Sequence, residues 1–393
     1  MDARTNSWLR RLALRRPFEP GGKGFDFGRE GKAQGARCIG HAHVFCTVWT
    51  MFGGQLRVLE IFGDSADLGR GHGAACRPMI RSYLDDRIGL TSQERWSGGD
   101  TDRDLILELA SQTLPHHEAF SPSLYAEMVA MADEAGITPA EAVVVGGFTD
   151  IVDVVRSQVG SAPEEPNCTA VLNPEQGFFA QTWDMHATAG EYVILLKLDP
   201  LMGPEALVQT TAGCLGQIGL NEAGISIGIN NLTSMGKQGV TWPFVVRNVL
   251  QQDNLDDAVE VVTTADLAGG HNFMIMGPDG RGVNIEAMPR HQRVTKVETE
   301  PFVHANHCLD ETASTEHGYR EPEHVLNSEV RLDIGYNNAD DPEVFFKDPE
   351  ISRHADHPHD VATCGAVIIE PAQRRMRALW GVPGDHPWET FQL

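Results

Sequence analysis

Cys168 is the residue whose position in this sequence suggests the most specific chemistry. It follows a Pro- and Glu-rich segment, residues 161–166, of a composition typical of an exposed loop that can be cut. Cleavage between Asn167 and Cys168 would place the thiol on a new N-terminal residue. The α-amine of that residue, with an ordinary pKa of about 8, could then deprotonate a thiol with an ordinary pKa of about 8.5. The thiolate could attack an amide or thioester carbonyl without a histidine base, giving an acyl-cysteine that water or an amine resolves.

A β-hairpin is predicted to begin at Cys168. Two β-prone runs, residues 168–172 and 178–183, flank a five-residue turn. In that turn Pro174 presets one backbone dihedral and Gly177 can adopt a positive φ. The second run ends in the pair Trp183-Asp184. The hairpin is therefore the element expected to position the candidate nucleophile.

Four blocks of sequence, taken in order, identify a resemblance. They are Cys-Thr-Ala at 168–170 with Ala-Gln-Thr-Trp-Asp at 180–184, Gly-Leu-Asn-Glu-Ala-Gly at 219–224, His-Asn-Phe-Met-Ile-Met-Gly at 271–277, and His-Ala-Asn-His at 304–307. Together they resemble the acyl-coenzyme A:6-aminopenicillanic acid acyltransferase (isopenicillin N acyltransferase) family of N-terminal-nucleophile hydrolases. The resemblance is clear over residues 168–309, weaker over 56–155 and 363–388, and absent before Met51. It implies an α+β fold, the N-terminal-nucleophile αββα four-layer sandwich, and self-cleavage just before the cysteine.

The resemblance also implies roles for individual residues. Cys168 would be the nucleophile, and Asp184 would hold its amine or position the substrate. Asn306 would donate a hydrogen bond to the oxyanion that forms during attack. The remaining candidates, for the substrate pocket, are Trp183, His271, His304 and His307. For His304 and His307 the favoured alternative is a structural role as hydrogen-bonded histidines.

Three positions depart from the family pattern. Asn167 stands where the fungal enzyme has Gly before its cysteine, His271 stands in place of Ser, and Asp360, near Thr363, stands where the acyltransferase has a basic residue. The acidic residue makes recognition of coenzyme A or of a penicillin carboxylate less expected. Hydrolysis of a small N-acyl or aminoacyl amide is therefore preferred over acyl transfer from acyl-CoA. Asn167 also permits a second cleavage route, in which its side chain cyclises on its own carbonyl.

Composition limits the partners of the chain. With 393 residues, 41% of them hydrophobic, it can bury a large core. A net charge of −24 argues against nucleic acid or an anionic membrane as a partner. No apolar run reaches the length of about 18 residues that a membrane span needs. Seven cysteines without a Cys-x-x-Cys pair favour a reducing, cytoplasmic environment over a disulfide framework.

We expect three segments along the chain. Residues 1–50 are basic and Gly-rich and are predicted to be a disordered extension, with a targeting arm or a start at Met51 as alternatives. Residues 51–167 form a helix-rich segment that ends at the cleavage loop. Residues 168–393 form a β-rich catalytic segment, one folded unit with 51–167. After cleavage the two would stay associated as a heterodimer, with a small-molecule amide substrate, no cofactor and no metal.

Periodicity predicts the individual elements. Strands are expected at 56–63, 192–198, 206–211, 225–230, 273–276, 283–286, 302–305, 366–370 and 376–380. Helices are expected at 104–114, 123–136, 138–155, 243–252, 256–264 and 321–334. The pair Thr138 and Glu141 predicts a capping box at the start of the third of these helices, and Asn254 is the expected cap of the fifth.

Two interpretations of another class remain open. One is a metal-dependent hydrolase, because the segment 354–360 clusters histidine and aspartate; it is interrupted by proline and lacks a helical histidine pair. The other is a binding protein that has kept the fold, stays uncleaved and has an unreactive Cys168.

Overall fold

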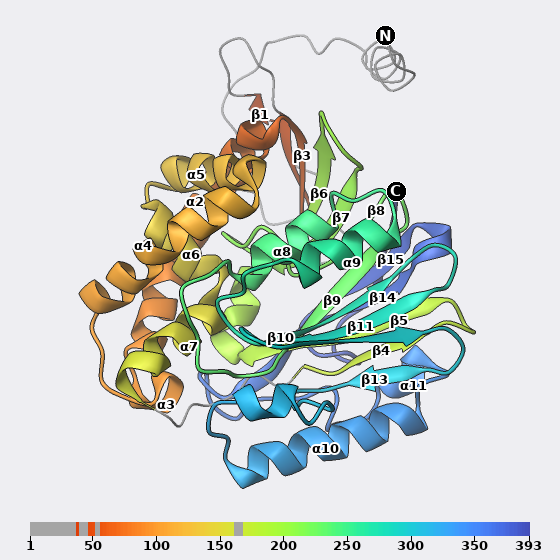
Figure 1. The fold of residues 1–393 in the computed structure, drawn as a ribbon. Helices are drawn as coiled ribbons and strands as arrows, with labels where there is room; N and C mark the ends of the chain where they lie inside the picture. Colours follow the sequence, from red (N-terminus) through yellow and green to blue (C-terminus); the bar gives the residue numbers. More distant parts are fainter. Residues whose placement is uncertain (1–36, 39–45, 52–55, 161–167) are drawn as a thin grey trace. The chain divides into compact units, whose positions relative to one another are not determined.

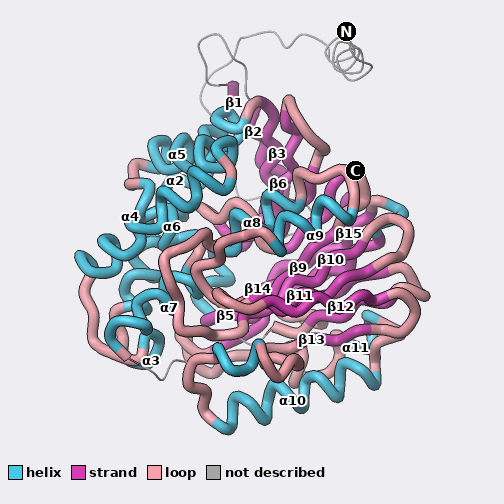
Figure 2. The backbone as a smooth tube through the Cα atoms, viewed as in Figure 1, coloured by secondary structure: helices cyan, strands magenta, loops and turns pink. Residues whose placement is uncertain are grey.

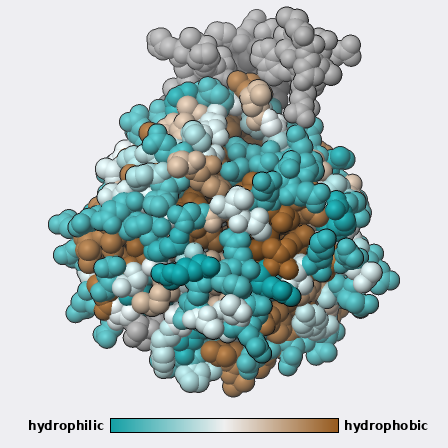
Figure 3. Space-filling model, in the orientation of Figure 1, coloured by the Kyte–Doolittle hydropathy of each residue, from teal (hydrophilic) through white to brown (hydrophobic). Residues whose placement is uncertain are grey.

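The computed structural model describes residues 37–38, 46–51, 56–160 and 168–393. Most of the predicted N-terminal extension, the loop at 161–166 and Asn167 lie outside the described residues. No helix in the described ranges is long and apolar enough to cross a membrane. Hydrophilic side chains cover most of the face seen in Figure 3, and hydrophobic ones gather in smaller areas between them.

Two β-sheets form the centre of the described part of the chain (Figure 1). The larger sheet runs in the order β1 (Arg37–Cys38), β2 (Cys46–Met51), β3 (Arg57–Gly63), β6 (Val193–Pro200), β7 (Ala206–Thr211), β8 (Ile218–Asn221), β9 (Ser226–Asn231), β10 (His271–Met276), β11 (Gly282–Ala287) and β12 (Gln292–Val297). The smaller sheet runs β13 (Phe302–His304), β4 (Ala170–Asn173), β5 (Phe178–His186), β14 (Val361–Glu370), β15 (Arg375–Trp380) and β16 (Glu389–Gln392). Neighbouring strands are antiparallel except β3 and β6, which are parallel.

The predicted hairpin is confirmed as β4 and β5. The Asn173 side chain accepts a hydrogen bond from the Gln176 N–H, at 2.9 Å, and Gly177 has a φ of 72°. These are the local interactions that the Asn-Pro-Glu-Gln-Gly sequence predicts for the turn. Strand β4 starts at Ala170, so Cys168 lies two residues before the paired part of the hairpin.

Helices cover the outer faces of both sheets. Helices α8 (Trp242–Val249) and α9 (Leu255–Thr263) contact β9, β10 and β11 of the larger sheet. Helix α10 (Pro322–Asn337) contacts β13 of the smaller sheet, and α11 (Pro342–Phe345) contributes Phe345 to the hydrophobic cluster on that side. The larger core cluster includes the facing side chains of both sheets. The α+β fold and its αββα layer order are therefore confirmed.

The helix-rich part of residues 51–167 gathers at one end of the sheets (Figure 2). It contains α2 (Ser65–Thr91), α3 (Glu94–Ser97), α4 (Arg103–Phe120), α5 (Pro122–Ala135), α6 (Pro139–Gly146) and α7 (Phe148–Val159). The Thr138–Glu141 capping box predicted for α6 is present, and so is the Asn254 cap of α9. The predicted helix over 138–155 is two helices, because the chain turns at Gly147. Short 3₁₀ turns occupy Ala187–Tyr192, Ala313–Glu316 and Pro371–Gln373.

The Gly-rich stretch at 69–73 is helical, although no helix is predicted there from the sequence. It lies in α2, where Gly69 and Gly73 face α5. A Cβ atom at Gly69 would lie 2.0 Å from the Glu127 carbonyl oxygen, and one at Gly73 would lie 2.3 Å from that of Met131. These glycines are therefore explained by the close approach of two helices. The exposed edge strands β12 and β16 were also not predicted, since they lack a buried apolar pattern.

The close packing of α2 on α5 leads to a prediction with a control in the same helix. Gly69→Ala should destabilise the fold by about 1–3 kcal/mol, because the added methyl group forces the two helices apart. Gly89→Ala should instead be neutral or stabilising by up to about 1 kcal/mol, since a Cβ there meets nothing within 4 Å. The urea midpoints of the two variants measure the difference. Equal shifts would contradict this account of the helix contact.

Candidate active site

The Cys168 thiol lies between the two sheets. The side chain is 2% exposed and belongs to the same core cluster as Ala170 and Leu172. The Asp184 N–H points at Sγ from 3.4 Å, and the Asp184 carbonyl oxygen lies 3.7 Å from it. The pairing of β4 with β5 thus places the predicted nucleophile directly against the predicted aspartate.

Arg331, on α10, connects the residues of the site. It is fully buried, and its Nη1 donates to the Cys168 carbonyl oxygen at 2.9 Å and to Thr169 Oγ1 at 2.8 Å. Its Nη2 donates to Asn306 Oδ1 at 3.0 Å. Burial lowers the pKa of Arg331 to about 10, so the guanidinium stays charged at neutral pH. One cation from the outer helix layer therefore holds both Cys168 and Asn306.

Asn230, on β9 of the larger sheet, holds the same carbonyl from the other side. Its Nδ2 lies 3.1 Å from the Cys168 carbonyl oxygen and 3.5 Å from that of His304. Its Oδ1 accepts from Asn272 Nδ2 at 3.4 Å. The Cys168 carbonyl is therefore fixed by a side chain from the opposite sheet as well as by Arg331.

Asp184 is fully buried, and its carboxylate is only partly hydrogen-bonded. Thr363 Oγ1 donates to Oδ1 at 2.8 Å, whereas Oδ2 makes no hydrogen bond to a described residue. Thr363 faces Asp184 at an irregularity in the pairing of β14 with β5, between Thr363 and Gly365, and such bulges often re-aim side chains beside active sites. Burial raises the pKa of Asp184 to about 6, although Arg331 and Thr363 oppose the rise.

The same environment keeps the thiol protonated in the intact chain. Burial, followed by the charge of Asp184, raises the pKa of Cys168 above its ordinary value. A buried thiol is a weak nucleophile until a base takes its proton. The arrangement can therefore perform nucleophilic chemistry only with a proton acceptor close to Cys168.

Asn306 follows β13 and belongs to the Cys168 cluster. Its backbone N–H donates to Ser328 Oγ at 2.8 Å, and its Nδ2 donates to the Asn231 carbonyl oxygen at 3.0 Å. A side-chain amide has two N–H groups, so one remains to serve a second acceptor.

The other candidate residues lie at different distances from this cluster. Trp183 is buried in β5 beside Asp184, and alternation along the strand turns its side chain away from the face of Asp184 and into the core cluster that also contains Cys168. His304 Nε2 pairs with Glu286 Oε1 at 2.8 Å, and His307 Nδ1 pairs with Ser328 Oγ at 2.8 Å. Both rings are therefore held beside Asn306 by hydrogen bonds, and burial lowers the pKa of His307 to about 4.

His271 does not join the cluster. It lies on β10 next to Asn272, whose side chain faces the site, so alternation turns His271 to the other face of the sheet. There its Nε2 lies 3.2 Å from Thr149 Oγ1, and its Nδ1 lies 3.3 Å from Asp150 Oδ1. Burial lowers the pKa of His271 to about 3, so the ring is neutral.

Sequence reasoning missed Arg331 and Asn230. Asn230 gave a weak signal, because two consecutive amides in a buried strand are uncommon. Arg331 gave none, because an arginine in a mixed polar and apolar helix ordinarily faces water. Only the packing of α10 on the smaller sheet turns it inward.

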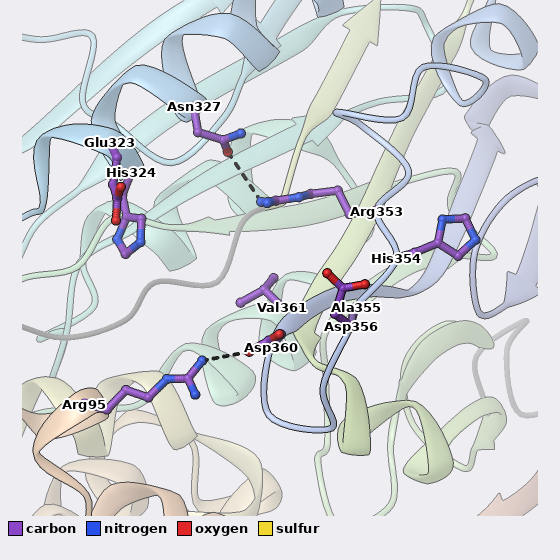
Figure 4. Close-up of a pocket in the computed structure, with 10 residues that line it drawn as sticks. All are labelled: Arg95, Glu323, His324, Asn327, Arg353, His354, Ala355, Asp356, Asp360 and Val361. Atoms are coloured by element: carbon purple, nitrogen blue, oxygen red, sulfur yellow. Dashed lines mark hydrogen bonds and ion pairs between the residues drawn. The ribbon is translucent and has the colours of Figure 1, made fainter.

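A polar cavity of about 410 Å³ adjoins the site (Figure 4). Its walls are residues of α10, the loop before β14 and α3: Arg95, Glu323, His324, Asn327, Arg353, His354, Ala355, Asp356, Asp360 and Val361. Asn327 Oδ1 accepts from Arg331 Nε at 3.0 Å and from Arg353 Nη1 at 3.4 Å. Arg331 thus connects a residue of the cavity wall to the Cys168 carbonyl oxygen.

The loop at 354–360, considered above for metal binding, lines this cavity. Its His354 pairs with Asp385 at 2.8 Å, and its Asp360 pairs with Arg95 at 3.3 Å. Within the described ranges, no group of three or more His, Cys, Asp or Glu side chains is arranged to hold a metal ion. His354 and Asp360 instead pair with residues outside the loop.

Comparison with known proteins confirms the resemblance seen in the sequence. Residues 171–341 match the model of the acyl-coenzyme A:6-aminopenicillanic acid acyl-transferase family. The acyl-coenzyme A:6-aminopenicillanic-acid-acyltransferase 40 kDa form of Emericella nidulans is 24% identical over 252 residues, which are 63% of this chain and 68% of that protein.

Two solved structures are also similar. A variant of conjugated bile acid hydrolase from Clostridium perfringens aligns with 57% of this chain and 92% of its own, at a TM-score of 0.40 and 9% identity. Penicillin V acylase from Agrobacterium tumefaciens aligns with 55% and 82%, at a TM-score of 0.35 and 11% identity.

The contacts of Arg331 predict a pH-dependent loss of stability. Arg331→Met should cost about 3–5 kcal/mol, because it removes the cation that offsets the buried Asp184 charge. The pKa of Asp184, already raised to about 6, should rise further, so ionising it costs more as pH increases. The deficit measured by urea unfolding should therefore be larger at pH 8 than at pH 5. The deficit should become independent of pH when Asp184→Asn is introduced into both the wild-type and the Arg331→Met proteins. With Asp184 present, a deficit that is equal at pH 5 and pH 8 would contradict the coupling between Arg331 and Asp184.

Proposed function

We propose, from its relationship to the acyl-coenzyme A:6-aminopenicillanic acid acyltransferase family, that this protein is a self-processing N-terminal-cysteine enzyme that acts on amides. It would cleave itself between Asn167 and Cys168 and then use Cys168 as the nucleophile. The observation that supports this most is the placement of Cys168. Its thiol contacts the Asp184 backbone, and its carbonyl is held by Arg331 and Asn230, while Arg331 also donates to Asn327 in the wall of the polar cavity.

Self-cleavage would begin with attack of the Cys168 sulfur on the Asn167 carbonyl carbon. The nearby Asp184 carboxylate, which is ionised above about pH 6, would take the thiol proton and pass it to the departing Cys168 nitrogen. The C–N bond breaks and a thioester forms between Asn167 and Cys168. Water then hydrolyses this thioester, giving an Asn167 carboxylate and a free thiol. In the alternative route, the Asn167 side-chain nitrogen attacks its own carbonyl carbon, forming a succinimide and releasing the same Cys168 amine.

The mature site would use the released amine as its base. The amine accepts the thiol proton, the thiolate attacks the substrate carbonyl, and the proton moves to the leaving nitrogen as the amide bond breaks. Water hydrolyses the resulting acyl-Cys168. The unfilled Oδ2 of Asp184 suits a new α-amine as its partner, and a carboxylate there would orient that amine and stabilise its protonated form.

Asn306 is proposed as the oxyanion donor, through the Nδ2 hydrogen that Asn231 does not use. Arg331 would keep the Asn306 side chain in place by donating to its oxygen. A donor fixed before the reaction costs little reorganisation as negative charge develops. Trp183, His304 and His307 would contribute to the walls around the reacting groups.

Hydrolysis of a small N-acyl or aminoacyl amide is the reaction we favour. Transfer of an acyl group from acyl-CoA to an amine is the second candidate. One contact favours it: Arg95 pairs with Asp360, so the acidic residue at that position does not face a ligand as an isolated negative charge. A reducing compartment such as the cytoplasm would keep Cys168 as a thiol.

Mass spectrometry of the purified full-length chain tests the self-cleavage directly. We expect the wild-type protein to give two associated fragments, the second beginning at Cys168, and Cys168→Ala to remain one chain. The thiol is the attacking group, so its removal stops the direct route. A wild-type chain that stays intact after long incubation would overturn the proposal.

The same spectra separate the two cleavage routes. A plain Asn at the end of the upstream fragment supports attack by the thiol. A succinimide or isoaspartate there supports cyclisation of Asn167. Cleavage that persists in Cys168→Ala would also point to cyclisation.

The hydrogen bond from Thr363 predicts a shift in the pH profile. Thr363→Val removes a donor to the Asp184 carboxylate, so the pKa of Asp184 should rise and the acid limb of the cleavage rate, near pH 6 in the wild type, should move up by about one unit. Thr138→Val is the matched control, because Thr138 also donates to a carboxylate, that of Glu141, outside the site. Identical profiles for the wild-type and Thr363→Val proteins would remove Asp184 from the mechanism.

A further inference from the structure

The cavity that Asn327 connects to Arg331 is lined mostly by charged and polar side chains. Glu323, His324 and Asn327 come from α10, Arg353 comes from the loop before β14, and Arg95 comes from α3. In Figure 4, Arg353 extends toward Asn327, while Arg95 reaches Asp360 at the opposite side. A cavity with so little apolar lining is suited to the polar part of a ligand.

Arg353 is the arginine in this cavity that forms no ion pair with a described residue. Its side chain donates to Asn327 Oδ1 at 3.4 Å, and its charge helps to oppose the burial-driven rise in the pKa of Asp184 without direct contact. It is half-buried, so its guanidinium is partly removed from water. A guanidinium presents several N–H donors in a planar fork, and one weak bond to an amide leaves most of them for an oxyanion.

The other charged groups of the cavity are less suited than Arg353 to bind an anion. Arg95 is already paired with Asp360. Glu323 and Asp356 are exposed to water, which screens their repulsion of an anion at the inner wall. His324 Nδ1 is buried without a hydrogen-bond partner among the described residues, so the cavity also offers a free polar contact.

Arg353 is also close to the proposed chemistry. Its backbone N–H donates to Thr363 Oγ1 at 2.9 Å, and the same hydroxyl donates to Asp184. Its side chain shares Asn327 Oδ1 with Arg331, which holds the Cys168 carbonyl. A ligand group bound to Arg353 would therefore contact a residue that is linked by hydrogen bonds, through Thr363 and Asn327, to Asp184 and Arg331.

We propose that Arg353 binds an oxyanion carried by the substrate and so determines which amides or acyl donors reach Cys168. The oxyanion is a carboxylate of an N-acyl amino acid or a phosphate of an acyl-CoA, since both present oxygens that a guanidinium fork can bind. This inference rests on the proposed function, because it places the anion beside the nucleophile of that reaction. It adds the chemical feature by which the substrate is recognised.

Binding to full-length Cys168→Ala protein tests the anion site without cleavage or turnover. The probes are N-benzoylglycine, N-benzoylglycinamide, which lacks the carboxylate, and coenzyme A, each titrated by calorimetry. The carboxylate should bind about tenfold or more tightly than its amide, because a hydrogen bond to a charged group contributes about 1.5–3 kcal/mol. Arg353→Met should abolish this advantage, and Arg353→Lys should retain part of it.

Arg81→Met is the matched control, since Arg81 is exposed on α2, outside the cavity, and should leave all three affinities unchanged. An Arg353-dependent advantage for N-benzoylglycine identifies a carboxylate ligand, and Arg353-dependent binding of coenzyme A identifies a phosphate. If neither anion loses affinity in Arg353→Met, or if the amide binds as tightly as the carboxylate and coenzyme A does not bind, the proposal is wrong.

Turnover measurements on protein that retains Cys168 distinguish the proposed anion site at Arg353 from the proposed enzymatic function. Arg353→Met should lower kcat/KM for an anionic amide about tenfold or more and leave that for its neutral counterpart unchanged. Equal losses for both substrates would contradict a role in anion recognition. Anion binding that depends on Arg353 in a protein that neither cleaves itself nor hydrolyses amides would retain the anion site and reject the proposed function.

Discussion

The buried guanidinium of Arg331 is the interaction on which the rest of the site depends. It joins the outer helix layer, the start of the β4–β5 hairpin and Asn306 by hydrogen bonds of 2.8–3.0 Å. A buried cation is costly to remove from water and remains charged only when its donors are satisfied. The charge of Arg331 also restrains the rise of the Asp184 pKa. The positions of Cys168 and Asn306 and the protonation state of Asp184 therefore depend on one contact network.

The same network would keep the intact chain unreactive toward external substrates. The thiol is buried and protonated, and it has no amine beside it while its nitrogen belongs to a peptide bond. Release of that nitrogen would supply a base and a partner for Asp184 Oδ2 in a single step. In this account the polar surroundings are already in place before cleavage, and cleavage adds the missing proton acceptor.

The sequence predicts features that rest on local interactions. The hairpin turn at 173–177 and the Thr138 and Asn254 caps are confirmed, because nearby residues determine them. The αββα layers are confirmed as well, and they were expected from the family resemblance. Helix α2 was not predicted, because glycine usually weakens a helix. Here the glycines allow the close contact between α2 and α5. Cys168, Asp184 and Asn306 could be selected from sequence motifs, and the structure brings them together. Arg331 and Asn230 come from distant elements, so only tertiary packing reveals them.

The chemical state of Cys168 in the purified protein tests the central claim most directly. A 2-cyanobenzothiazole condenses stably with a cysteine that carries a free α-amine and not with one inside a chain. We expect labelling of the denatured protein to give a single adduct, on the fragment 168–393 and at its first residue. Wild-type protein that forms no such adduct at Cys168 would contradict the N-terminal nucleophile, whatever activity it displays.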